Sequence, residues 1–290
     1  MDEYRFGGIV LRWDDGGCPL LPGNLAQKFR HSGALSSERI TLRARFAHLA
    51  PLLQNPCLHS GPVFDRYEVE GEPLLVYHWG HLPAAFGIFP HRIGAEGGDA
   101  CIFDPDMARQ VPLPFDWFLG VSGLHRALLR RDAPILHASY IAHQGGAILF
   151  AAPSQTGKST QAQLWHDHAG AEIVNGDRAL LRRLDGRWHA CGFPCSGSSE
   201  FCENRTLPLR AIVLLAQGPE DGVEELPLSR QMTGLLSGMQ VYPWDQAEVD
   251  RAFDLAGLIA REVPVVRLTC TPTRNAVETL RQYLEVKGYV

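Results

Sequence analysis

One segment, residues 147–170, constrains the fold of this chain more than any other. An apolar run, AILFAA, leads through the polar loop PSQTGKS into a helical segment, TQAQLWHDHAG, which Gly170 can end. Gly157, Lys158 and Ser159 match the end of the Walker A pattern G-x-x-x-x-G-K-[ST]. Between a strand and a helix, such a loop points backbone N–H groups at an anion, and the lysine adds positive charge. The segment therefore predicts a nucleotide-binding P-loop in an α/β fold.

The loop departs from that pattern at two positions. Ala152 stands where the first glycine is expected, and Gln155 replaces a residue that is often glycine. Glycine there reaches positive φ and lets the backbone approach phosphate, whereas alanine removes no N–H donor, so a formed loop of weaker affinity is expected. Lys158 is expected to face solvent. The alternative is an ordinary helix capped by a lysine and two hydroxyls. The predicted nucleotide-binding residues are Ser154, Gln155, Thr156, Gly157, Lys158, Ser159 and Thr160.

A histidine and an aspartate are expected beside this loop. Residues 135–143, ILHASYIAH, precede the turn QGG, so they predict a hairpin that places His137 on the strand paired with the one that feeds the loop. Asp177 follows the next predicted strand, EIVN, and lies 19 residues after Lys158. This spacing suits a kinase, in which the carboxylate orients a metal ion or accepts the proton of an incoming hydroxyl. A lone histidine on a strand is more often structural, and only this context favours a catalytic role.

These stretches resemble the HPr kinase/phosphorylase family, whose catalytic fold is related to that of ATP-dependent phosphoenolpyruvate (PEP) carboxykinase. Its members have a strand that begins with His, then G-x-S-G-x-G-K-S, then a strand that ends in D-D. This chain has LHASYIA, APSQTGKS and VNGDRALL in the same order. It is most similar to the HPr-kinase-like proteins of peptide-maturation systems, through LHAS, GKST and GFPCSG at 192–197. The resemblance covers roughly residues 116–285.

The resemblance implies an ATP- and Mg²⁺-dependent kinase that phosphorylates a Ser or Thr hydroxyl of a peptide or small protein. It assigns Lys158 and Ser159 to phosphate and metal, Asp177 to the acidic pair and His137 to the strand histidine. Gly176 replaces the first aspartate of the pair. Either Asp177 then acts as both base and metal partner, or Glu200 or Glu203 takes over one role. The implied catalytic residues are Asp177, His137 and Lys158, and the implied metal ligands are Ser159, Asp177 and Glu200.

Other functions stay open at this point. The same scaffold suits a kinase for a free small molecule, and the altered loop with a single aspartate also suits a regulatory subunit that binds nucleotide without transfer. Arg205, Arg210 and Arg274 are further candidates for phosphate contacts. The sequence specifies no acceptor, and a homo-oligomer remains open.

The composition of the chain changes near residues 111–117, VPLPFDW. Short apolar runs precede this point, so residues 1–115 are expected to form a β-rich N-terminal module and residues 116–290 the P-loop kinase domain of the HPr kinase/PEP carboxykinase type. Helices are predicted at 36–53, with Ser36 or Ser37 as cap, and at 116–131. Beyond the loop the pattern predicts a hairpin at 179–192, a strand at 264–270 and helices at 248–260 and 275–284. The strands predicted in the N-terminal module are 7–13, 63–71, 73–80, 84–90 and 100–104.

Charge and composition exclude several other classes. A net charge of −5 and a pI near 6.2 leave no basic footprint for nucleic acid or an anionic membrane. The start MDEYRFGG is unlike a signal peptide and no apolar run approaches the length of a membrane span, so a cytoplasmic protein is expected. His189, Cys191, Cys195 and Cys202 offer zinc ligands without the usual paired spacing, so buried reduced thiols are favoured over a zinc site.

Overall fold

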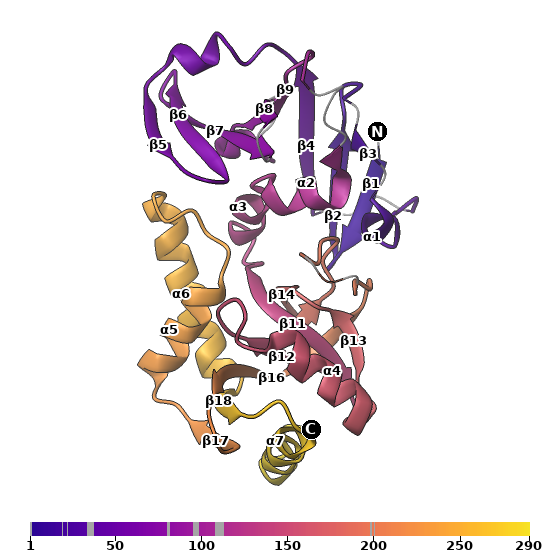
Figure 1. Ribbon diagram of the computed structural model, residues 1–290. Coiled ribbons are helices and arrows are strands. Elements are labelled where there is room, and N and C mark those ends of the chain that lie inside the picture. The colour runs from indigo at the N-terminus through magenta and orange to yellow at the C-terminus, as the bar shows by residue number, and fades with distance from the viewer. Residues whose placement is uncertain are drawn as a thin grey trace. The chain divides into compact units, whose positions relative to one another are not determined.

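The computed structural model describes residues 2–18, 20–21, 23–33, 38–79, 82–94, 99–107, 113–197, 199 and 201–290. The chain divides into two compact units, Met1–Ala127 and Leu128–Val290 (Figure 1). The boundary expected from the sequence, between residues 115 and 116, falls after the first residue of the helix α2 (Phe115–Val121), and the observed division falls inside α3 (Leu124–Leu129).

The first unit is built around a mixed sheet with the strand order β1-β2-β4-β9-β8-β7-β6-β5. The pairs β2–β4 and β4–β9 are parallel, and the other neighbours are antiparallel. The first unit is thus built mainly of β-strands. The strands are β1 (Asp2–Phe6), β2 (Ile9–Asp14), β4 (Arg39–Phe46), β5 (Cys57–Ser60), β6 (Phe64–Val69), β7 (Glu72–Trp79), β8 (Leu82–Ile88) and β9 (Cys101–Phe103).

The helix predicted at 36–53 is wrong. Residues Arg39–Phe46 form β4, and a short 3₁₀ helix, η1, covers Leu52–Gln54. In RITLRARF the apolar residues Ile40, Leu42 and Ala44 alternate with polar ones, so one face of a strand is buried. The proposed caps Ser36 and Ser37 lie outside the described residues.

The single helix predicted at 116–131 is divided in two. Gly123 has a φ of 76°, which ends α2 and separates it from α3. Phe115 and Phe118 of α2 contact the ring of Trp13 on β2, with centroid distances of 5.7 and 5.2 Å. The helix therefore belongs to the aromatic core of the first unit.

In the second unit, the strands β11 (Ile135–His143) and β16 (Thr206–Gln217) each pair in more than one place. The beginning of β11 pairs with β14 (Arg178–Leu184), and the rest pairs with β12 (Gly146–Ala151) and β13 (Glu172–Asn175). Strand β16 pairs with β15 (Arg187–Cys191), β12 and β18 (Val265–Cys270). The pairing β12-β11-β14-β15-β16-β12 thus closes on itself, and β18 continues from β16 to β17 (Gly222–Glu225).

The hairpins predicted in this unit are confirmed. Gln144 and Gly145 join β11 to β12 with φ of 48° and 75°, and Asp185 and Gly186 join β14 to β15 with φ of 48° and 77°. Positive φ at both central residues is the type I′ turn that two-residue hairpins favour.

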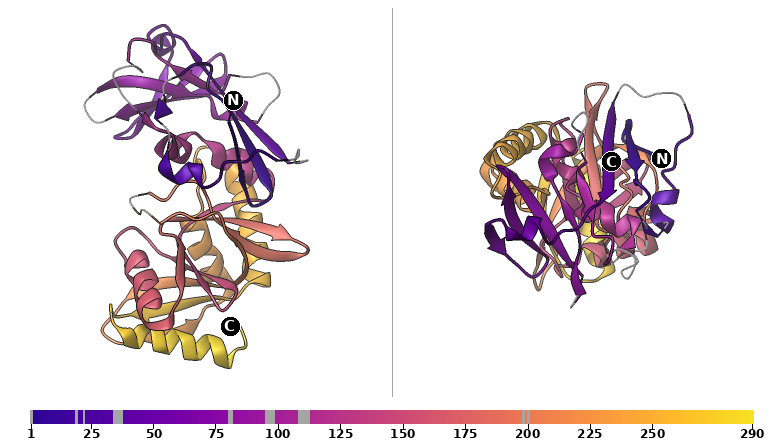
Figure 2. Two further views of the ribbon diagram at one scale, coloured as in Figure 1. Left: turned by 90° about the vertical axis from the view of Figure 1, so that its right-hand side faces the viewer. Right: turned by 90° about the horizontal axis from the view of Figure 1, so that it is seen from above.

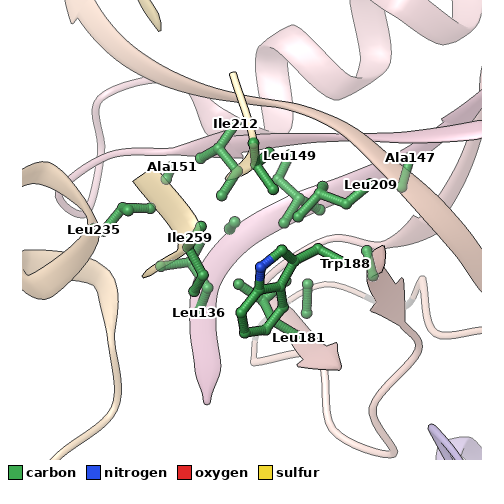
Figure 3. Packing of buried hydrophobic residues seen from close by; sticks show 14 of the residues in the cluster. Leu136, Ala147, Leu149, Ala151, Leu181, Trp188, Leu209, Ile212, Leu235 and Ile259 are labelled. Atoms are coloured by element: carbon green, nitrogen blue, oxygen red, sulfur yellow. The ribbon is translucent and has the colours of Figure 1, made fainter. Parts of the chain in front are cut away.

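Helices cover both faces of the parallel strands β12, β16 and β18. On one face α4 (Lys158–Ala169) and α7 (Arg274–Val286) bury Trp165 and Leu280 against Phe150. On the other face lie α5 (Leu228–Gly238) and α6 (Gln246–Glu262), which contribute Leu235 and Ile259 (Figures 1 and 3). The predicted helices at 248–260 and 275–284 are therefore confirmed. In the left view of Figure 2, α7 is the yellow helix beside the C-terminus.

Among the described residues, none of the helices is long and apolar enough to cross a membrane.

Candidate functional site

The loop that joins β12 to α4 lies at the carboxyl end of a parallel strand, the edge where α/β sheets usually bind ligands. Gly157 precedes the first residue of α4 with a φ of 110°, a backbone conformation open to glycine alone without strain. Gln155 has a φ of 65°, whereas Ala152 is not among the described residues with positive φ. The missing glycine at 155 therefore leaves a strained residue, and the missing glycine at 152 does not.

Lys158 is buried, with 8% of its surface exposed, so the expectation that it faces solvent is wrong. Its ammonium donates hydrogen bonds to the carbonyl oxygens of Ala152 and Pro153, at 2.9 and 3.2 Å. Burial lowers the pKa of Lys158, and the nearby carboxylate of Asp177 opposes that lowering. The lysine side chain thus folds back onto the loop, and its ammonium lies against the carbonyl oxygens at the start of the loop.

Asp177 is held from two sides. The imidazole Nε2 of His137 donates to Asp177 Oδ1 at 2.9 Å, and Arg178 Nε lies 3.3 Å from Asp177 Oδ2. Burial would raise the pKa of Asp177, but the hydrogen bond from His137 and the charges of His137, Arg178 and Lys158 outweigh it. The pKa of this carboxyl therefore lies below its ordinary value, and the group is ionised at neutral pH.

The turn that carries Asp177 is organised by Asn175, the last residue of β13. Its Oδ1 accepts hydrogen bonds from the backbone N–H groups of Asp177 and Arg178, at 2.9 and 2.8 Å. Its Nδ2 donates to the carbonyl oxygens of Phe193 and Cys195, both at 3.1 Å. This fully buried amide therefore joins the aspartate turn to the segment 192–197.

The segment after β15 packs directly against the turn. A Cβ atom added at Gly176 would overlap the hydroxyl and Cβ of Ser199, and one added at Gly197 would lie 2.6 Å from the Asp177 carboxyl carbon. The hydroxyl of Ser196 in turn bonds to the carbonyl oxygen of Ser199. Ser199 thus fills the space beside Gly176 into which a side chain at that position would extend.

A cavity of about 320 Å³ joins these groups at the mouth of the loop. The structure brings most of the predicted site residues to it, together with Gly176 and Ser199. Thr156 is not among the residues that line it. Glu200 lies outside the described residues, and Glu203 is exposed and does not line the cavity. The predicted residues that line it are His137, Ser154, Gln155, Gly157, Lys158, Ser159, Thr160 and Asp177.

The remaining candidates lie elsewhere. Arg205 pairs with Glu172 at 2.6 Å and Arg274 with Glu278 at 2.7 Å. Arg210 packs its side chain against Gly146. None of the arginines predicted to contact phosphate lines the cavity.

The residues considered for zinc are used differently. Among the described residues, no metal-binding group is formed by His189, Cys191, Cys195 and Cys202, because their potential ligand atoms do not come together. The buried Cys202 thiol donates to the Phe193 carbonyl oxygen at 3.0 Å, and Cys195 Sγ accepts from Arg178 at 3.2 Å. These thiols contribute to the packing of the segment that covers Asp177.

Sequence reasoning missed Asn175, Arg178 and Ser199. Asn before Gly is a turn signal, and it was available in VNGD. Ser199 carried no such signal, because its place beside Gly176 depends on how the segment after β15 folds back.

The comparisons with known proteins cover mainly the second unit. The family model described as ScmC, SynChlorMet cassette protein, matches residues 119–285. Among solved structures, the Hpr(Ser) kinase/phosphatase from Coxiella burnetii is 12% identical, with 53% of this chain and 93% of that chain covered and a TM-score of 0.32. The search of curated proteins found no match.

Proposed function

The chain belongs to the ScmC family of SynChlorMet cassette proteins, and for this member we propose an ATP-dependent kinase that transfers the γ-phosphate to a Ser or Thr hydroxyl of a peptide or small protein. The observation that carries the proposal is the meeting of Lys158, Ser159, His137 and Asp177 in one cavity at the start of α4. The resemblance of LHAS, GKST and GFPCSG to HPr-kinase-like proteins of peptide-maturation systems supports the choice of acceptor.

The loop binds the phosphates in this proposal. The first N–H groups of α4 have no acceptor within the helix and no side-chain cap, and no acidic residue lies in the first turn to repel an anion. The ammonium of Lys158 supplies positive charge from below the loop. Burial makes that charge more effective, because fewer water molecules screen it.

The donors present also fit Mg²⁺, which prefers oxygen ligands. The Ser159 hydroxyl and the Asp177 carboxylate line the same cavity, and the two Asp177 oxygens keep lone pairs beyond those used by His137 and Arg178. When bound there, Mg²⁺ neutralises charge that develops on the transferred phosphate. Ser159 and Asp177 would hold it, and Glu200 remains a proposed ligand.

Asp177 is proposed as the base. Its ionised carboxylate takes the proton of the attacking hydroxyl while the hydroxyl oxygen bonds to the γ-phosphorus and the oxygen that bridges to the β-phosphate leaves with ADP. His137 and Arg178 hold the carboxylate in position and keep it charged. Asp177 therefore serves as both base and metal partner in this proposal.

A second candidate is a nucleotide-binding subunit without transfer. The observation that favours it is the space beside Gly176, which Ser199 fills, so only one acid of the expected pair is present in the described turn. In this second candidate, the loop between β12 and α4 binds the phosphates of the nucleotide, but no phosphate is transferred.

One experiment separates these functions. The wild type and Lys158→Met are incubated with radiolabelled ATP, Mg²⁺ and candidate peptides encoded beside the gene, and mass spectrometry detects added phosphate. Methionine keeps the buried stem and removes the ammonium, so we expect loss of ATP binding and of transfer, whereas Lys287→Met, at an exposed ion pair with Glu225, should leave both unchanged. Unchanged ATP binding in Lys158→Met would refute the proposal that this loop binds phosphate. ATP binding without phosphate transfer in the wild type would favour the second candidate.

A further inference from the structure

We propose that a trough along α5 selects the acceptor peptide by an acidic side chain three or four residues from the hydroxyl that receives phosphate. This inference rests on the proposed kinase function, because the trough leads to Asp177. We define the α5 trough as the cavity on the far side of Asp177 together with the larger apolar cavity that continues from it.

The first part of the α5 trough is a cavity of about 310 Å³. It shares His137 and Asp177 with the cavity of the phosphate loop, so the paired side chains lie between the two. Arg178, Ser237, Gly238 and Gln240 complete much of its lining. An acceptor hydroxyl at the boundary that the two cavities share would lie beside the Asp177 carboxylate and face the loop cavity, where the γ-phosphate is proposed to bind.

The second part is a cavity of about 520 Å³ that shares Ser237 and Gly238 with the first. Leu214, Leu215 and Ala216 of β16 contribute apolar walls, and Ala152 and Pro153 close it toward the phosphate loop. The two cavities therefore form one path from the Asp177 carboxylate along α5.

One face of α5 lines this path. Arg230, Thr233, Gly234 and Ser237 lie at helical spacing, and each lines the larger cavity. A Cβ atom at Gly234 would overlap Leu214, so the glycine lets the helix approach β16 closely. The opposite face buries Leu235, and on the cavity face the hydroxyls of Thr233 and Ser237 donate to carbonyl oxygens of α5 and keep lone pairs for a ligand.

Positively charged side chains line the larger cavity, and Arg230 lies near the start of α5, away from Asp177. Arg230 and Arg267 both line the larger cavity. Among the ion pairs of the described residues, none involves Arg230. Arg267 pairs with Glu224 at 3.4 Å, and the Glu224 side chain is 62% exposed. An exposed pair of this kind contributes little and exchanges readily, so both guanidinium groups suit an incoming carboxylate.

The length of the path sets the spacing. Residues 230 and 237 are separated by about 10 Å along the helix at 1.5 Å per residue, and an extended peptide advances about 3.3 Å per residue. Ser237 also lines the cavity that holds Asp177, so an acidic side chain at Arg230 lies at least about three or four residues from a hydroxyl at Asp177. A peptide is favoured over a nucleoside because the path continues past the loop to the carboxylate that would receive the proton.

The test uses synthetic peptides of 13 residues with one central Ser, in which a single Glu or Lys is moved from two to five residues away on either side. Peptide binding is measured by fluorescence anisotropy, and phosphate transfer by mass spectrometry. We expect Glu three or four residues away on one side to raise kcat/KM at least about tenfold over Lys. Arg230→Glu should reverse this preference, and the matched Arg281→Glu, on α7 at the opposite face, should not.

The outcomes distinguish this inference from the kinase proposal. If the rate of phosphate transfer does not depend on the position of Glu and is unchanged in Arg230→Glu, the proposed role of the α5 trough is wrong. The kinase proposal would still stand in that case. Weaker ATP binding in Arg230→Glu would also overturn it, because the cavity would then hold the nucleoside. Acid-dependent peptide binding that Arg230→Glu abolishes, without any transfer, would support the trough and refute the kinase.

Discussion

Gln155 carries the backbone strain of the loop that joins β12 to α4. Its φ of 65° is the left-handed conformation, which costs a residue with a side chain about 1–2 kcal/mol relative to the right-handed one. Gln144, in the hairpin turn between β11 and β12, has a similar φ of 48° and does not line the cavity. Substitutions at Gln144 therefore measure the effect of backbone strain on stability alone. Substitutions at Gln155 measure its effect on stability and on ligand binding together.

We expect Gln155→Val to lower the free energy of unfolding by about 1–2 kcal/mol relative to Gln155→Gly, because a β-branched residue is worst suited to positive φ. The pair Gln144→Val and Gln144→Gly should show a similar difference in urea unfolding. ATP affinity measured by calorimetry should fall in Gln155→Val alone. Equal ATP affinity in Gln155→Val and Gln155→Gly would show that the loop backbone does not bind phosphate.

At the scale of single residues, the sequence predicted which charged and polar side chains meet at the site. It predicted less well how those side chains are buried and hydrogen-bonded. His137, Lys158 and Asp177 were each singled out, and they meet in one cavity. Their assignment as catalytic residues stays a prediction. The burial of Lys158 and the part played by Asn175 depend on contacts with segments distant in the sequence, and a local pattern does not contain that information.

At the scale of elements, the segment after β15 determines what the aspartate turn can contain. Ser199 lies against Gly176, and Gly176 is not among the glycines with positive φ. An alanine there is therefore limited by space and not by backbone conformation. The same contact explains how this chain accommodates a single acid in place of the expected pair.

A double-mutant cycle tests this contact. We expect Gly176→Ala to lower the free energy of unfolding by about 1–3 kcal/mol through overpacking, and Ser199→Gly to restore part of that loss by making room. Urea unfolding of the wild type, both single variants and the double variant gives the coupling. Additive effects would mean that the two residues do not share this space.

Elements with a clear period were predicted well, and those set by packing were not. The strand EIVN and the helices around 248–260 and 275–284 were confirmed, because both period and boundaries are local. The strand β4 was mistaken for a helix, although its alternation was present, because several charged residues obscured the period. The helix α5 and strand β17 were missed, because α5 is ordered by packing on the sheet and the four-residue β17 by pairing with β18.

At the scale of the whole molecule, a chain with a net charge of −5 gathers positive groups around its candidate site. Lys158 and the start of α4 line the cavity, Arg178 pairs with Asp177 beside it, and Arg230 and Arg267 line the α5 trough. Overall charge therefore gave no indication of an anionic ligand, whereas the local motif did. The match of the ScmC model over 119–285 covers this part of the chain.

The central claim is that Asp177 makes this protein a phosphotransferase, and a single-turnover assay at saturating ATP tests it most directly. The wild type, Asp177→Asn and the control Asp185→Asn, at the β14–β15 turn, are compared with the acceptor peptide and Mg²⁺. Asparagine keeps the size and removes the charge and basicity, so the transfer rate should fall by about 10²–10⁴-fold, while ATP affinity by calorimetry stays similar or rises. Asp185→Asn should match the wild type. Equal transfer rates in the wild type and Asp177→Asn would contradict the account.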